Sequence, residues 1–176
     1  MIFENNQIQI DQLPQVETVD YYLLDASYLR VSYIGNAIFF AFLLIGPLVS
    51  IVIIDDQNLA FLKILLPSLW FILMLFSFWV TSKGFKLKGY ALREKDILYR
   101  QGILFRSTTA IPFNRVQHCE IKEGPIERFF GLKTLEVYTA GGQSSDLSIP
   151  GLRGEAAQQL KTFIVKNTSE DESDEV

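Results

Sequence analysis

The sequence has few of the residues that usually carry catalytic or metal chemistry. Its 176 residues include one cysteine, Cys119, and one histidine, His118. A single cysteine excludes an internal disulfide framework, and this pair excludes zinc sites built from several cysteines or histidines. The two residues are neighbours in a stretch that we predict to be a strand, so their side chains point to opposite faces. We expect one to face the core and the other solvent.

Signatures of covalent catalysis and of phosphate-binding loops are also missing. The hydroxyl clusters at 107–109 and 144–145 have no partnered histidine or lysine base at a recognisable spacing. The chain contains no Walker-type glycine-rich loop. We therefore predict no catalytic residue, no metal site and no cofactor, and we expect that the chain is not an enzyme.

Charged side chains are absent from two long apolar runs, residues 31–54 and 64–80. A bilayer core of about 30 Å needs roughly 20 helical residues to cross it. The first run is long enough, and the second becomes so if residues 59–62 join it and Lys63 extends toward the headgroups. We predict a transmembrane helical hairpin over 30–82, with an acidic turn at residues 55–56.

Basic residues are absent from the N-terminal segment 1–29, which carries five acids, and from the C-terminal tail 167–176, which also carries five. Residues 83–166, by contrast, hold 14 Lys plus Arg against 8 Asp plus Glu, a net charge of +6. A basic domain that directly follows a membrane helix indicates an anionic partner, and anionic lipid is the nearest one. Positively charged flanks remain in the cytoplasm, so we predict a multi-pass protein with both termini cytoplasmic.

After Gly84 the hydrophobic pattern changes to period two. Leu135, Val137 and Thr139 share one face of a strand, which is typical of a half-buried sheet. Strands spaced by about 8–12 residues predict an antiparallel sandwich or barrel. The expected strands are 90–93, 97–101, 106–111, 116–122, 132–140 and 147–149. After Pro150 the period becomes 3.6 and predicts one amphipathic helix that covers an open end of the barrel.

The segments outside the hairpin and the β-domain show weaker patterns. Residues 1–20 mix Asn, Gln and acids and are expected to be extended or loosely ordered. The apolar, aromatic stretch 21–28 predicts a short helix, either at the membrane interface or packed on the domain. The acidic tail 167–176 is predicted to be disordered.

The stretch from Ile111 to Gly142 resembles the YdbS-like family of membrane-flanked bacterial pleckstrin-homology-like (PH-like) domains. The residues that carry the resemblance are Ile111-Pro112, Arg115, Gln117, Gly124-Pro125, Arg128, Gly131-Leu132 and Thr139-Ala140-Gly141. It covers about residues 20–165, including the hairpin. It implies a transmembrane hairpin followed by a mainly-β PH-like domain with one C-terminal helix, over 83–166, in a bacterial inner membrane. Glu123, where the family often has glutamine, departs from the pattern.

Two candidate binding sites follow. The first is a basic lipid-binding patch close to the membrane exit, made of Lys83, Lys86, Lys88, Arg93 and Arg106; solvated charge and a topology signal are the alternative explanation. The second is a partner-binding surface made of Arg115, Pro125, Arg128 and Phe129. Pro125 suits the first position of a single helical turn. That turn either plugs one end of the barrel or contacts a partner.

Three functions remain open. The first is a binding or scaffold module that assembles with itself or with a larger related PH-domain membrane protein. The second is a module that responds to anionic lipid headgroups. The third is an accessory subunit of a transport or export system. Nucleic-acid binding is not expected, because the chain is predicted to be tethered to a membrane and resembles a family of membrane proteins.

Overall fold

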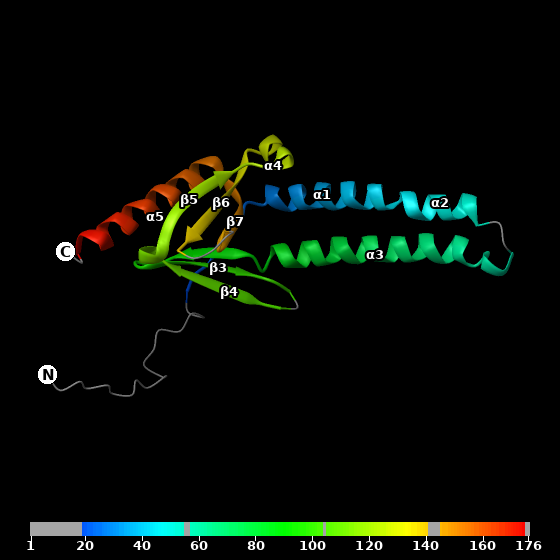
Figure 1. The fold of residues 1–176 in the computed structure, drawn as a ribbon, viewed down its shortest axis with the longest axis horizontal. Coiled ribbons are helices and arrows are strands. Elements are labelled where there is room, and N and C mark those ends of the chain that lie inside the picture. Colours follow the sequence, from blue (N-terminus) through cyan, green and yellow to red (C-terminus); the bar gives the residue numbers. More distant parts are fainter. Residues whose placement is uncertain (1–18, 55–56, 104, 141–144, 175–176) are drawn as a thin grey trace, which may run out of the picture.

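The computed structural model describes residues 19–54, 57–103, 105–140 and 145–174. Two long helical segments lie side by side and project from one end of a β-domain (Figure 1). The expected acidic turn at 55–56 and most of the expected loose N-terminal segment lie outside the described residues.

The projecting segments form the predicted helical hairpin. Its first arm contains α1 (Ser27–Leu43) and α2 (Ile45–Ile53), followed by the short helix η3 (Gln57–Leu59), and its second arm is α3 (Leu62–Phe85). The break at Leu44 lies one turn before Pro47, whose missing N–H removes a helical hydrogen bond. Both arms are long and apolar enough to cross a membrane, and most of their side chains lie outside the core.

Polar and aromatic contacts join the two arms of the hairpin. The Asn36 amide donates to the Thr81 hydroxyl over 2.7 Å, and the Trp70 indole N–H donates to the Phe40 carbonyl over 3.2 Å. The rings of Tyr33 and Phe78 stack with centroids 5.4 Å apart. These contacts fix the register of α1 against α3.

The β-domain contains two antiparallel sheets. Four strands form the first in the order β1-β2-β3-β4, and three form the second in the order β5-β6-β7. The bounds are β1 Tyr22–Leu23, β2 Gly89–Leu92, β3 Asp96–Gln101, β4 Ser107–Pro112, β5 Val116–Lys122, β6 Leu132–Thr139 and β7 Leu147–Arg153. The short helix η4 (Phe113–Arg115) connects the sheets. The hairpin is thus inserted between β1 and β2, two neighbouring strands of one sheet.

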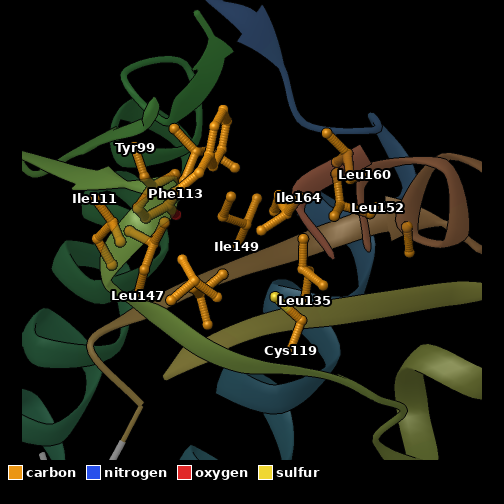
Figure 2. Packing of buried hydrophobic residues seen from close by; sticks show 14 of the residues in the cluster. Tyr99, Ile111, Phe113, Cys119, Leu135, Leu147, Ile149, Leu152, Leu160 and Ile164 are labelled. Atoms are coloured by element: carbon orange, nitrogen blue, oxygen red, sulfur yellow. The ribbon is translucent and has the colours of Figure 1, made fainter. Parts of the chain in front are cut away.

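The core lies between the two sheets and the C-terminal helix α5 (Gly154–Asp174) (Figure 2). Phe113 and Ile111 contribute from one side, Leu135 from the other and Ile164 from α5. Leu135 and Val137 are fully buried, as the period-two pattern predicts.

The neighbouring residues His118 and Cys119 divide as predicted. Cys119 is buried and His118 is exposed. Burial raises the pKa of the Cys119 thiol to about 11, so it remains protonated at neutral pH.

Two sequence-based expectations are corrected at the start of the described chain. Residues 22 and 23 form a strand rather than a helix, because Tyr22 and Leu23 pair with Tyr90 and Gly89. The helix begins at Ser27, whose N–H donates to the Asp25 carboxylate over 2.8 Å. Leu24 is buried in the core, so the folded domain includes residues that the predicted boundaries 83–166 leave out.

A third correction concerns the C-terminal tail. The helix α5 continues through residue 174, where the acidic composition predicts disorder from 167. Thr168 contributes to the extension, because its hydroxyl contacts the Phe113 carbonyl at 3.2 Å and the Ile164 carbonyl at 2.9 Å. A tertiary contact thus holds the helix beyond the last apolar residue of its stripe.

Strand β7 also runs four residues beyond its expected end, and Gly151 permits this. Its φ is +68°, and a Cβ at this position would lie 2.6 Å from the Cβ of Tyr28 in α1. Glycine therefore meets both a backbone requirement and a close approach of helix to strand.

We predict that Gly151→Ala destabilises the folded chain more than Gly131→Ala does. Both glycines have positive φ, which costs an alanine roughly 1–2 kcal/mol, but only at Gly151 does the added Cβ meet a neighbour. The clash with Tyr28 should add roughly 1–3 kcal/mol. Thermal unfolding of the full-length variants in detergent measures the difference, and equal losses would contradict the packing argument.

Candidate functional site

Four of the five predicted lipid-binding residues lie where the hairpin meets the β-domain. Lys83 and Lys86 are exposed at the end of α3, Lys88 is half-buried between α3 and β2, and Arg106 is exposed just before β4. Arg93 does not join them. It follows β2 at the opposite end of β3, roughly 20 Å away for a six-residue strand.

Arg93 is also committed to a local ion pair. Its Nε donates to the Asp96 carboxylate over 2.6 Å, and a second guanidinium nitrogen contacts the other carboxylate oxygen. A bidentate pair of this kind largely neutralises the guanidinium. The structure therefore separates Arg93 from the basic cluster in both position and charge.

A pocket of about 670 Å³ opens at the same junction, and we call it the junction pocket. Its walls come from α1, from the end of α3 and from the β3–β4 loop. They include Tyr28, Ser32, Phe76, Trp79, Val80, Thr81, Phe85, Lys88, Gln101, Ile103, Phe105 and Ser107. Most of this surface is apolar, and its polar residues come from both parts, Ser32 and Thr81 from the hairpin and Lys88, Gln101 and Ser107 from the domain side. The hairpin and the domain therefore build one pocket together.

The β3–β4 loop contributes the outer wall of the junction pocket. Gly102 has a φ of +104°, and a Cβ there would lie 1.8 Å from the Phe105 carbonyl oxygen, so only glycine fits this turn. Ile103 packs close to Gly84 of α3. The turn leaves the Phe105 side chain 91% exposed beside the hairpin. Sequence reasoning missed Phe105, although a large apolar residue between a glycine and Arg106 in a loop is a usable signal.

Lys88 lies at the inner end of the junction pocket. Its ammonium is 5.4 Å from the centroid of the Tyr28 ring, within cation–π distance. Burial lowers the pKa of Lys88, because a low-dielectric environment disfavours the charged amine. An anionic group beside this ammonium would offset that penalty.

A second hollow of about 500 Å³ adjoins the junction pocket, and we call it the polar chamber. The two share Tyr28, Lys88 and Gln101. The remaining walls of the chamber are mainly polar and include Tyr99, Thr109, Glu127, Thr134, Asp146 and Ser148. An apolar pocket and a polar one therefore meet at Lys88.

The four predicted partner-binding residues form two separate groups. Arg115 belongs to η4, whereas Pro125, Arg128 and Phe129 belong to α4 (Pro125–Phe129). The seven residues of β5 lie between them, a separation of roughly 20 Å. The structure thus does not bring Arg115 to the other three.

Helix α4 forms as the sequence predicts. Pro125 occupies the first turn, and the Gly124 N–H donates to the Glu127 carboxylate over 2.9 Å. The helix packs beside α1, where the Arg30 guanidinium lies 5.2 Å from the centroid of the Phe130 ring. Phe129 does not fill the end of the barrel; it is 89% exposed.

The described residues show no metal centre. No group of three or more His, Cys, Asp or Glu side chains gathers among them in a way that could hold an ion. One polar network lies on the exposed face of β5 and β6, and its members pair with one another. Lys122 contacts Glu136 at 2.5 Å and the Tyr138 hydroxyl at 3.1 Å. Its lysine is therefore engaged by its own sheet.

The chain belongs to the bacterial PH domain family, whose sequence model matches residues 29–168. It is 27% identical over 144 residues to the UPF0699 transmembrane protein YdbT of Bacillus subtilis (strain 168), an alignment that covers 73% of this chain and 29% of YdbT. It is 32% identical over 79 residues to the UPF0699 transmembrane protein YdbS of the same strain, covering 45% of this chain and 48% of YdbS. The chain thus spans less than half the length of either relative.

Among solved structures, the chain is similar to a DUF1696 family protein with a pleckstrin-homology domain from Shewanella loihica PV-4. The identity is 15%, the TM-score is 0.37, and the match covers 46% of this chain and 70% of the other. The family model carries the assignment. The chain is a membrane protein with a bacterial PH domain, as its resemblance to the YdbS-like family predicts.

We expect Lys88 to lose its proton at a lower pH than an ordinary lysine. Full-length chain in detergent, labelled by reductive ¹³C-methylation, gives the pKa from an NMR titration. Phe85→Ala, which opens the wall beside Lys88, should move the pKa back toward 10.5. In the wild type, the folded chain binds fewer protons than the unfolded chain just below pH 10.5. The contribution of Lys88 to the free energy of unfolding therefore rises with pH in that range. An identical pKa in both proteins would rule out burial as the cause.

Proposed function

We propose that the chain is a non-catalytic binding module, anchored by its hairpin in a bacterial inner membrane with both termini in the cytoplasm. Its PH-like domain would take up a phospholipid of the inner leaflet in the junction pocket. The observation that carries this proposal is the shared construction of that pocket, with walls from a candidate membrane span on one side and from the β-domain on the other.

The depth of the pocket supports a lipid as its occupant. Lys83 and Lys86 mark headgroup level, because lysines flanking a span remain at the interface. Trp79 and Phe76 precede Lys86 by seven and ten helical residues, or about 10 and 15 Å along α3. Phe105 lines the same pocket as these two residues, so the tip of the β3–β4 loop would reach the upper acyl-chain region. An opening at that depth faces lipid rather than water.

The charges around the pocket support a phosphate-bearing ligand. Lys83, Lys86 and Arg106 lie exposed around the junction, and each basic residue near an anionic leaflet contributes roughly 1 kcal/mol of attraction. Lys88, in contrast, lies inside and would contact one phosphate directly. The exposed residues would concentrate anionic lipid near the domain, and Lys88 would hold the bound molecule.

We predict that Val80→Trp, which fills the junction pocket, removes a lipid that otherwise stays bound through delipidation. The matched control is Ile72→Trp, which introduces the same side chain at an exposed position of α3 outside the pocket. Native mass spectrometry of the full-length chain should show one retained phospholipid in the wild type and in Ile72→Trp. We expect occupancy to fall about tenfold in Val80→Trp, equivalent to about 1.4 kcal/mol. Retention by Val80→Trp at the wild-type level would refute the proposal.

A second candidate function is assembly with another copy of the chain or with a larger related PH-domain membrane protein. The exposed Phe129 on α4, next to Arg128 and beside α1, favours it. An exposed aromatic flanked by arginine is typical of interface hot spots. Pro125 would support this surface by fixing the backbone at the first turn of α4.

We predict that Phe129→Ser lowers self-association of the full-length chain in mild detergent. Phe163→Ser, on the partly exposed face of α5, is the control and should leave self-association unchanged. Light scattering coupled to size-exclusion chromatography measures the mass of the complex. A wild-type chain that is monomeric throughout the accessible concentration range would exclude self-assembly through α4.

A further inference from the structure

The geometry points to the headgroup that this site selects. We propose that the polar chamber takes a headgroup with one phosphate and one ammonium group, as in an ethanolamine phospholipid, in preference to a headgroup with several negative charges. This inference rests on the proposed function, because it assigns the ligand class of the same site.

The first argument is the continuity of the two hollows. The junction pocket and the polar chamber share Tyr28, Lys88 and Gln101. A lipid with a chain along the apolar wall at Phe76 and Phe105 would therefore place its phosphate near Lys88 and its headgroup beyond, in the chamber. The order of apolar wall, ammonium and polar wall matches the order of chain, phosphate and headgroup in a phospholipid.

The second argument is a buried hydroxyl without a partner. Tyr99 lines the chamber and is only 3% exposed, and its hydroxyl finds no hydrogen-bond partner among the residues that the structure describes. A buried polar group left unpaired costs about 1–3 kcal/mol, so a ligand oxygen that accepts from it gains that difference. Burial raises the pKa of Tyr99, so the hydroxyl stays protonated and can donate.

The third argument is the charge of the chamber. Its ionisable walls combine one ammonium, from Lys88, with two carboxylates, from Glu127 and Asp146. A phosphate matches the single ammonium. A further negative charge would meet carboxylates instead, whereas an ammonium group would be attracted to them.

Hydrogen bonds hold both carboxylates in place. Glu127 accepts from the Gly124 N–H at 2.9 Å and from the Thr134 hydroxyl at 3.1 Å. Asp146 accepts from the N–H and the hydroxyl of Thr139 at 2.9 and 2.7 Å, and these bonds lower the pKa of Asp146. These bonds hold Glu127 beside Thr134 and Asp146 at the other end of β6, roughly 15 Å along the strand, so each carboxylate is a separate position for a compact cation.

The test is lipid competition on the full-length chain. The protein is equilibrated in nanodiscs with equal amounts of acyl-matched phosphatidylethanolamine, phosphatidylglycerol and cardiolipin, and the retained lipid is identified by native mass spectrometry. We expect phosphatidylethanolamine to be enriched about fivefold over its bulk share, the ratio that one ion pair of ordinary strength gives.

Matched variants separate the contributions. Glu127→Gln and Asp146→Asn each keep a hydrogen-bond acceptor but remove a charge, so the variant at the carboxylate that pairs with the headgroup ammonium should abolish the enrichment while one lipid stays bound. Glu120→Gln, an exposed carboxylate on β5 outside the chamber, should change nothing. Lys88→Gln should lower the occupancy of all three lipids.

The outcomes distinguish this inference from the function on which it rests. A bound lipid that is mainly phosphatidylglycerol or cardiolipin, or that mirrors the bulk mixture, overturns the headgroup assignment and leaves lipid uptake standing. Enrichment that survives in both Glu127→Gln and Asp146→Asn also overturns it. A wild-type chain that retains no lipid at all overturns the proposed function itself.

Discussion

The pairing of β1 with β2 across the hairpin is the contact on which the rest of the structure depends. Tyr22 pairs with Tyr90 and Leu23 with Gly89, and the two tyrosine rings stack with centroids 5.7 Å apart. The membrane-directed helices leave the sheet at one strand and return at its neighbour. The hairpin therefore has two adjacent attachments to the domain, and its direction relative to the sheet is set by strand pairing rather than by a linker.

Contacts around the first attachment reinforce this geometry. Asp25 donates its N–H to the Gly151 carbonyl over 3.1 Å, and its carboxylate accepts from Arg153 over 2.6 Å. The Arg153 guanidinium and the Ser27 N–H lower the pKa of Asp25, so the carboxylate is ionised at neutral pH. Tyr28 follows directly, in contact with Gly151 and facing Lys88. Tyr28 thus both packs against β7 and lines the junction pocket.

Much of this arrangement could be predicted from the sequence. Uncharged runs predict the hairpin, and period-two alternation around Leu135 predicts the sheets, because both patterns reflect burial of whole segments. The basic character of Lys83 and Lys86 identifies the neighbourhood of the site. Single elements that depend on tertiary contacts are harder to predict. Strand β1 is too short to show a period, and the end of α5 has a composition typical of disordered tails.

The junction pocket itself could not be predicted, because its walls come from segments that lie far apart in the sequence and meet only in the folded chain. Phe76 and Trp79 have the composition of lipid-facing residues, and Phe105 that of a loop residue; only the return of β3 toward α3 brings them together. The prediction that Arg93 belongs to the lipid-binding patch was wrong for a different reason. Arg93 pairs with Asp96, three residues further along the chain, and this local ion pair separates Arg93 from the basic cluster that its charge predicted it would join.

The insertion of the hairpin within a sheet also has a consequence for biogenesis. During synthesis β1 emerges first, but its partner β2 follows only after both arms of the hairpin have been made. If a single arm crossed the bilayer, β1 and β2 would lie on opposite sides of it, and the first sheet could not close. Under the proposed anchoring, both arms must therefore cross the bilayer together before β1 can pair with β2, and a mis-inserted chain would expose the edge of β2.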